Sequence, residues 1–142
     1  MTGVKIGLTL AAAIALCGPA QAQDEVPGYM CDLESGPHGA NWFPTSLVLV
    51  AAGFKAVVHD TVLQRLTKAP AEAEVITNSD THLVVRWRLP VAVSGNSTII
   101  TYRAAIDRRS RSVEVTAGGQ GGLLKARGVG RCDLASDLHA PK

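Results

Sequence analysis

Aromatic residues are scarce in this chain of 142 residues, which has two tryptophans, two tyrosines and two phenylalanines. Ligand pockets are usually lined by hydrophobic and aromatic side chains, so this composition argues against a large ligand cavity. An excess of charge of one sign is also missing, because the formal net charge is +2. No global field therefore favours nucleic acid or an anionic membrane as a partner.

The sequence also lacks the short motifs that mark common enzyme chemistries. Neither the His-Glu-x-x-His pattern of zinc hydrolases nor the Gly-x-Ser-x-Gly turn of a serine nucleophile occurs. The glycine-rich stretch 117–125 ends in a lysine, but no Ser or Thr follows it as a phosphate loop requires. We therefore predict that the protein is not an enzyme, with no catalytic residues and no cofactor. An unrecognised hydrolase is the alternative.

Residues 1–22 have the organisation of a secretory signal peptide. Lys5 precedes an apolar run that ends at Cys17, and a Gly-Pro break and a small-x-small triplet ending at Ala22 follow. The apolar run is shorter than the roughly 20 residues that a helix needs to cross a bilayer. We therefore expect cleavage after Ala22, a single domain over 23–142 with no transmembrane segment, and a periplasmic or secreted location.

Two cysteines remain after this cleavage, Cys31 and Cys132, and each begins the pattern Cys-Asp-Leu-x-Ser-x-x-His. An exported compartment oxidises such a pair, so we predict a disulfide between them. The alternative is a zinc site completed by His38 and His139. Structural zinc sites usually draw their ligands from tighter spacings than these, so we predict no metal.

Between the cysteines, apolar residues recur with a period of two, and clusters of Gly, Asn, Ser and Asp separate the apolar runs. A capping-box pattern at Thr61 and Gln64, ahead of Pro70, predicts one short helical turn. The sequence therefore predicts an all-β domain, either a small antiparallel β-barrel or a sandwich. We expect a meander of about seven strands closed by the disulfide.

The strongest hairpin signal lies in residues 82–107. A two-residue turn at 95–96 would place Trp87 opposite Ala104 and would gather apolar side chains on one face. A slip by one residue would bring charged side chains onto that face, which is why we prefer this register.

The opposite face of the same hairpin would then pair Arg88 with Arg103, and like charges directly opposite each other are destabilising. The segment before the hairpin offers compensation through a three-residue turn at 79–81. That turn would place Glu72 opposite Arg88 and Glu74 opposite Arg86. We interpret these residues as solvated cross-strand ion pairs.

Arg108, Arg109 and Arg111 form the densest cationic run, at a turn that follows Asp107. Two interpretations remain open, a solvated hairpin turn and an anion-binding site for an envelope component. We keep the three arginines as candidate anion-binding residues. If the turn is merely solvated, replacing all three arginines with Ser should change the stability of the fold little.

The segment Tyr-Met-Cys-Asp-Leu-Glu-Ser-Gly at 29–36, the β-rich middle and the late cysteine resemble the periplasmic inhibitors of c-type lysozyme. The resemblance implies a small antiparallel barrel with half-cystines near both ends. Those inhibitors carry a Ser-Gly-x-x-Tyr loop, and the tyrosine is missing from residues 35–42. No site residue is therefore transferred from that family.

Together these features predict an exported, non-catalytic β-domain that binds an envelope component or a secreted protein. An inhibitor of a secreted hydrolase such as lysozyme is the first alternative, and the unrecognised hydrolase is the second.

Overall fold

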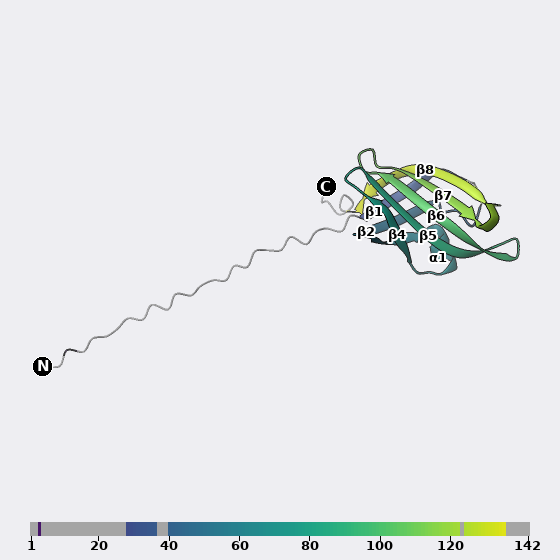
Figure 1. The fold of residues 1–142 in the computed structure, drawn as a ribbon, viewed down its shortest axis with the longest axis horizontal. Helices are drawn as coiled ribbons and strands as arrows, with labels where there is room; N and C mark the ends of the chain where they lie inside the picture. The colour runs from purple at the N-terminus through teal and green to yellow at the C-terminus, as the bar shows by residue number, and fades with distance from the viewer. Residues whose placement is uncertain (1–2, 4–27, 37–39, 123, 136–142) are drawn as a thin grey trace.

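The computed structural model describes residue 3 and residues 28–36, 40–122 and 124–135. Eight antiparallel strands form a closed barrel in which each strand pairs with the next and β8 pairs with β1 (Figure 1). The short helix α1 (Thr61–Leu66) joins β3 to β4, and a 3-10 turn (Gln120–Gly122) follows β7. The strands are β1 (Gly28–Ser35), β2 (Ser46–Ala52), β3 (Lys55–Asp60), β4 (Ala71–Asn78), β5 (His82–Val93), β6 (Asn96–Asp107), β7 (Ser112–Gly119) and β8 (Lys125–Leu134).

This architecture confirms the all-β prediction and selects a closed barrel of eight strands over a sandwich of about seven. The reason is the pairing of β1 with β8, which removes the free edges that a sandwich would keep. The predicted cleavage site at Ala22, together with His38 and His139, lies outside the described residues.

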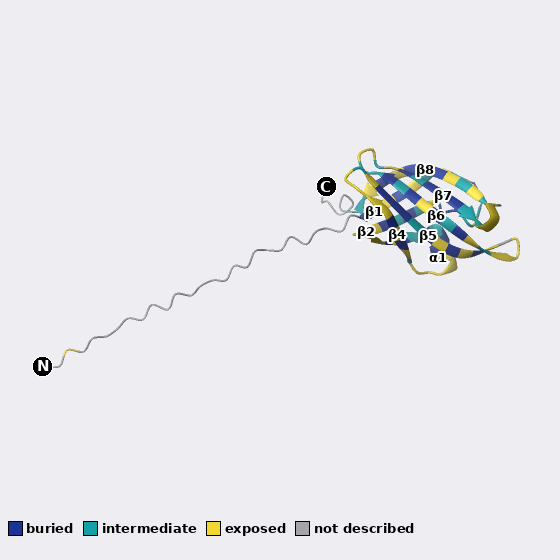
Figure 2. Ribbon diagram, in the orientation of Figure 1, coloured by how far each residue is buried: buried dark blue, intermediate teal, exposed yellow. Residues whose placement is uncertain are grey.

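Inward and outward residues alternate along the strands, as the two-residue period predicts (Figure 2). The barrel interior is filled by side chains. Trp87 and Tyr102 lie opposite each other on β5 and β6 and stack with ring centroids 5.4 Å apart. Aliphatic side chains pack around them, including the fully buried Leu49, Val58 and Ile100.

The disulfide between Cys31 and Cys132 is present and joins directly paired residues of β1 and β8. Both sulfur atoms are used by this bond, so the zinc site that included these two cysteines is excluded. Close packing surrounds the seam. A Cβ atom added to Gly128 would lie 2.6 Å from the Ser35 carbonyl oxygen, and one added to Gly130 would collide with the Asp32 carbonyl oxygen.

The predicted register of the β5–β6 hairpin is wrong by two residues. The turn lies at Ser94 and Gly95, where both φ angles are positive (50° and 81°). A two-residue turn of this kind requires positive φ at both central residues, and its twist matches that of the strands. Trp87 therefore pairs with Tyr102, not with Ala104. A shift of two residues leaves every side chain on its predicted face.

The charge pairing on the outer face changes with this register. Arg103 lies opposite Arg86, not Arg88. The positive charge of Arg86 is compensated as predicted, because Glu74 lies opposite it and forms an ion pair with it at 2.6 Å. Glu72 does not pair with Arg88, since the pairing of β4 with β5 ends at Glu74.

The predicted helical turn is present as α1, but its N-cap is Asp60 and not Thr61. Asp60 lies at the inward-facing end of β3, and its side chain accepts a hydrogen bond from the Leu63 backbone N–H at 2.7 Å. The hydroxyl of Thr61 accepts instead from the backbone N–H of Thr45, at 3.0 Å. Val62 and Leu63 are buried, so the helix covers one mouth of the barrel.

Candidate functional site

A surface cleft of about 310 Å³ lies where the connection between β1 and β2 packs beside α1. Its apolar lining includes Leu33, Phe43 and Pro44, and its polar lining includes Glu34, Thr61 and Arg65. Sites for small molecules commonly combine an apolar lining with a few polar groups, and this cleft has that composition at the lower end of the usual size range.

Arg65 comes from the last turn of α1 and is exposed to solvent. No carboxylate of the described residues forms an ion pair with it. The position of α1 is held by the hydrogen bond from the Thr45 N–H to Thr61 Oγ1. This bond joins the β1–β2 connection to the first residue of α1, and both line the cleft. It therefore helps to hold the helix that carries Arg65 in place.

Tyr102, one of the two buried stacked aromatic residues, is bonded to the connection between β1 and β2. The hydroxyl of Tyr102 donates a hydrogen bond to the Trp42 carbonyl oxygen, which lies in the connection between β1 and β2. Burial raises the pKa of Tyr102, the negative charge of Asp60 raises it further, and the positive charge of Arg65 opposes the rise. The phenol is therefore neutral and acts as a hydrogen-bond donor that fastens the connection to the barrel.

Asp60 is the one buried charged residue among those the structure describes, at 2% exposure. Burial raises the pKa of its carboxyl, and the backbone N–H groups of Leu63 and Val62 oppose that rise. Its Oδ2 atom and the Nε1 atom of Trp87 have no hydrogen-bond partner, although the indole is close enough to lower the Asp60 pKa slightly. Asp60 does not line the cleft, and its side chain caps α1.

The three candidate anion-binding arginines lie at the β6–β7 turn, at the end of the barrel opposite to α1. They are not equivalent. Arg108 donates to the Ser79 carbonyl oxygen at 2.8 Å and to Asn78 Oδ1 at 2.9 Å, and thereby holds the neighbouring β4–β5 loop. Arg109 is exposed. The backbone carbonyl of Arg111 accepts from the Cys132 N–H at 2.7 Å.

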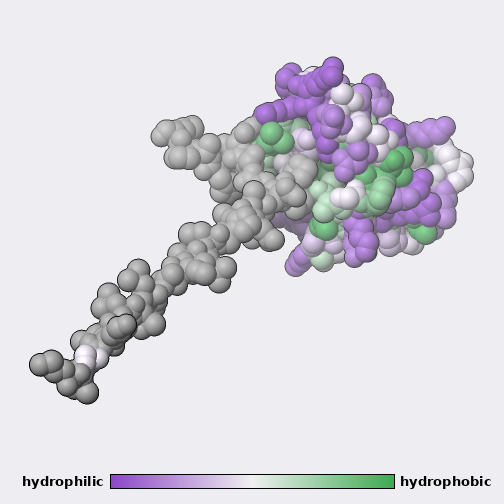
Figure 3. Space-filling view, turned by 60° about the vertical axis from the view of Figure 1, so that its left-hand side comes forward, coloured by the Kyte–Doolittle hydropathy of each residue, from purple (hydrophilic) through white to green (hydrophobic). Residues whose placement is uncertain are grey.

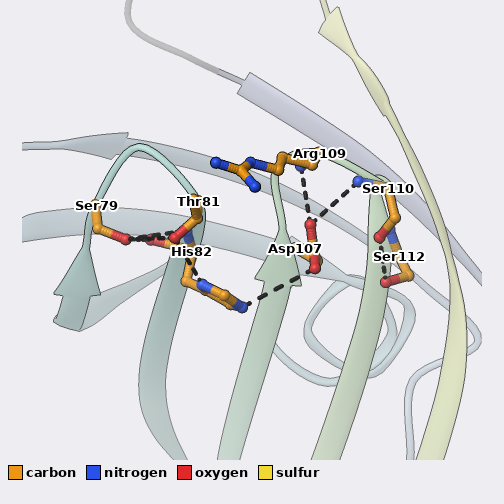
Figure 4. Close-up of polar contacts among 7 residues, drawn as sticks. All are labelled: Ser79, Thr81, His82, Asp107, Arg109, Ser110 and Ser112. Atoms are coloured by element: carbon orange, nitrogen blue, oxygen red, sulfur yellow. Dashed lines mark hydrogen bonds and ion pairs between the residues drawn. The ribbon is translucent and has the colours of Figure 1, made fainter.

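The turn itself is organised by Asp107, as Figure 4 shows. Its Oδ1 atom accepts from the backbone N–H groups of Arg109 at 2.9 Å and Ser110 at 3.1 Å. These bonds lower the pKa of Asp107. The sequence leaves a solvated turn and an anion-binding site open as interpretations, and the structure shows that the Asp107 carboxylate and the Arg108 side chain organise the turn.

Next to this turn, a hydroxyl, an imidazole and a carboxylate come together (Figure 4). Thr81 Oγ1 lies 2.9 Å from His82 Nδ1, and His82 Nε2 lies 4.0 Å from Asp107 Oδ2. The second distance exceeds a hydrogen bond. The His82 side chain is also 55% exposed. The group therefore lacks the oriented imidazole of a catalytic triad.

Sequence reasoning did not identify the cleft, because its walls come from segments that are far apart in the chain. Thr61 was noted only as a helix start, and Arg65 carried no motif. The face of the molecule that is coloured in Figure 3 is mixed, with green hydrophobic areas among purple hydrophilic ones. No cluster of three or more potential metal ligands occurs among the described residues. None of the helices in that part of the chain is long and apolar enough to span a membrane.

Comparison of the chain with protein-family models, with curated proteins and with solved structures yields no match. The barrel with a disulfide between its first and last strands agrees with the fold implied by the resemblance to lysozyme inhibitors. The comparisons do not support membership of that family.

Proposed function

We propose that this protein is an exported, non-catalytic binding protein that holds a small organic anion in the cleft beside α1. The observation that carries the proposal is the Arg65 guanidinium, which has no carboxylate partner among the described residues and lies in the lining with the apolar Leu33 and Phe43. An exported location is supported by the disulfide, which is consistent with an oxidising compartment.

The ligand class follows from the donors in the cleft. A guanidinium binds a carboxylate through two parallel N–H···O bonds, and these are among the stronger hydrogen bonds in proteins. The oxygen of Thr61 already accepts from Thr45, which leaves its O–H free to donate to a ligand. Glu34 lies in the same lining, and its negative charge disfavours a ligand that carries a second negative charge. The cleft therefore suits a monocarboxylate with an apolar tail that contacts Phe43.

Isothermal titration of the mature protein with medium-chain monocarboxylates tests this proposal, with the alcohols and amines of equal chain length as controls. We expect the acids to bind and the controls not to bind. Replacing Arg65 with Gln should weaken binding about tenfold or more, because a hydrogen bond to a charged group contributes about 1.5–3 kcal/mol. The matched control Arg109→Gln, at the other end of the barrel, should bind like the wild type. Equal affinity of Arg65→Gln would refute the proposal.

A second candidate function, inhibition of a secreted hydrolase, is favoured by the projecting tip of the β5–β6 hairpin. The hairpin extends beyond the rest of the barrel (Figure 1), and residues 94–97 at its tip are exposed. Such a tip has the shape needed to enter an active-site cleft. Inhibition assays against lysozymes and other secreted hydrolases test this function, and inhibition should disappear in an Asn96→Trp variant. A lack of inhibition across the panel would exclude it.

A further inference from the structure

More than half of strand β5 is not paired on the side that faces β4. The pairing of β4 with β5 begins at Asn78 and Leu83 and ends at Glu74 and Arg86. Beyond Arg86, β5 continues to Val93 and pairs only with β6. The chain of β4 before Glu74 pairs only with β3. The barrel is closed, but the end of β5 nearer to α1 therefore has an unpaired edge.

The backbone groups at this edge are identified by the alternation of an antiparallel strand. The Val75 N–H donates to Phe54, away from β5, so the neighbouring Glu74 directs its backbone groups toward Arg86. The backbone N–H and C=O groups of every second residue of β5 then point to the same side as those of Arg86. Arg88, Pro90 and Ala92 thus direct their backbone groups toward the open edge, where no strand pairs with them.

A groove of about 520 Å³ lies where β4 and β5 diverge, at the beginning of this edge. Glu74 and Arg86 neutralise each other at its closed end, with an ion pair of 2.6 Å. Glu72 and Arg88 line the same groove, and neither forms an ion pair within the part of the chain that the structure describes. The groove therefore presents one negative and one positive side chain next to the unpaired edge of β5.

We propose that an extended polypeptide segment of another protein binds here by adding a strand to β5. Its backbone would bond to Arg88 and Ala92, a basic side chain would face Glu72, and an acidic side chain would face Arg88. Strand addition to an exposed edge is a general mode of peptide recognition in which main-chain bonds give affinity and side chains give specificity. This site is separate from the cleft, whose lining shares none of its residues.

Pro90 distinguishes this occupant from a second copy of the chain. Proline has no N–H, so two β5 strands paired symmetrically about Pro90 would lack two hydrogen bonds. A different polypeptide leaves only one of its own carbonyl groups without a partner at that position. Pro90 thus disfavours self-association and leaves the donors of Arg88 and Ala92 available.

The decisive variant is Ala92→Pro, which removes a backbone N–H that faces the open edge and no bond to β6. Its matched control is Ala92→Ser, which keeps the N–H. The probe is a displayed library of random linear peptides selected on the mature protein, and enriched peptides are then measured by fluorescence anisotropy. We expect enriched peptides with alternating β-branched residues and both charges. Ala92→Pro should weaken them at least tenfold, and Ala92→Ser should not.

Arg88→Glu gives a second readout that does not depend on proline. It should weaken the selected peptides, and exchanging the acidic residue of the peptide for Lys should restore binding. A library without enrichment, equal binding by Ala92→Pro and Arg88→Glu, or a wild-type dimer that Ala92→Pro dissociates in sedimentation would each overturn the proposal. Carboxylate binding in the cleft should persist in both variants, and peptide binding should persist in Arg65→Gln, so the two proposals fail independently.

Discussion

The carboxylate of Asp60 accepts a hydrogen bond from the Leu63 backbone N–H at 2.7 Å, at a position that is 2% exposed. A residue of the barrel interior thus caps the helix that closes the barrel mouth. The stability of α1, and with it the wall that carries Arg65, depends on a buried acid.

Replacing Asp60 with Ala should lower the free energy of unfolding by about 1–3 kcal/mol, because the cap is lost and a buried N–H is left without a partner. Asp60→Asn should cost less, since its amide oxygen can still accept from Leu63. Urea denaturation measures both. Asp80→Ala, at an exposed turn, is the control and should lie within about 0.5 kcal/mol of the wild type. Equal stability of Asp60→Ala and wild type would contradict the capping role.

The raised pKa of Asp60 predicts a pH dependence of stability. Burial raises this pKa above its ordinary value of 3.8, so the folded state holds the proton more tightly than the unfolded chain. The resulting stabilisation is fully present below pH 3.8 and is lost as the pH rises through the folded-state pKa.

The Asp60→Asn variant has no titrating group at this position and serves as the reference. The pKa values of Asp107 and Glu114 are lowered, so these two acids make stability rise with pH in both proteins. Comparing the two proteins cancels that contribution. Unfolding measured at a series of pH values should show the wild type losing stability relative to Asp60→Asn as the pH rises above 3.8. A difference that stays constant across this range would show that the Asp60 pKa is not raised.

Arg108 and Arg109 should respond differently to substitution. Arg108→Ser removes two hydrogen bonds to the β4–β5 loop and should destabilise the protein by about 1 kcal/mol, an amount limited by solvent exposure. Arg109→Ser removes no side-chain bond of this kind and should change stability by less than about 0.5 kcal/mol. Thermal and urea unfolding provide the comparison. Identical effects would restore the interpretation of the tip as a uniform, solvated cationic run.

Gly130 should tolerate no side chain. A Cβ atom there would collide with the Asp32 carbonyl oxygen, a backbone atom of the paired strand, so Gly130→Ala must displace the β1–β8 seam. We expect a loss of about 3 kcal/mol in the free energy of unfolding. Gly118→Ala is the matched control on β7, where the nearest atom would be 3.7 Å away. Similar stability of the two variants would exclude the predicted collision.

The local chemistry of the chain was sufficient to predict several elements. The two-residue period specified strands, because one face of each strand must be buried. Two cysteines in a chain that we expect to be exported predicted the bond between Cys31 and Cys132, which is present. The opposition of Glu74 to Arg86 was also predicted correctly. Each of these follows from neighbouring residues or from a pairwise chemical preference.

The β5–β6 register and the helix cap depended on three-dimensional context. Registers that differ by two residues keep the same side chains buried, so hydrophobic pattern cannot separate them, and the turn at Ser94 and Gly95 selects one. Asp and Thr are both favoured N-cap residues, so residue type alone does not choose between Asp60 and Thr61. Asp60 takes that role because β3 ends with its side chain inside the barrel, next to the first turn of α1.

The sequence by itself therefore determined which residues are buried and that the chain forms an all-β domain with a disulfide. Only the tertiary structure decided that the sheet closes between β1 and β8, that a cleft forms around Arg65, and that β5 has an open edge. The physical reason is distance along the chain. Burial patterns act through neighbouring residues, whereas closure, clefts and edges result from contacts between segments whose pairing no local pattern specifies.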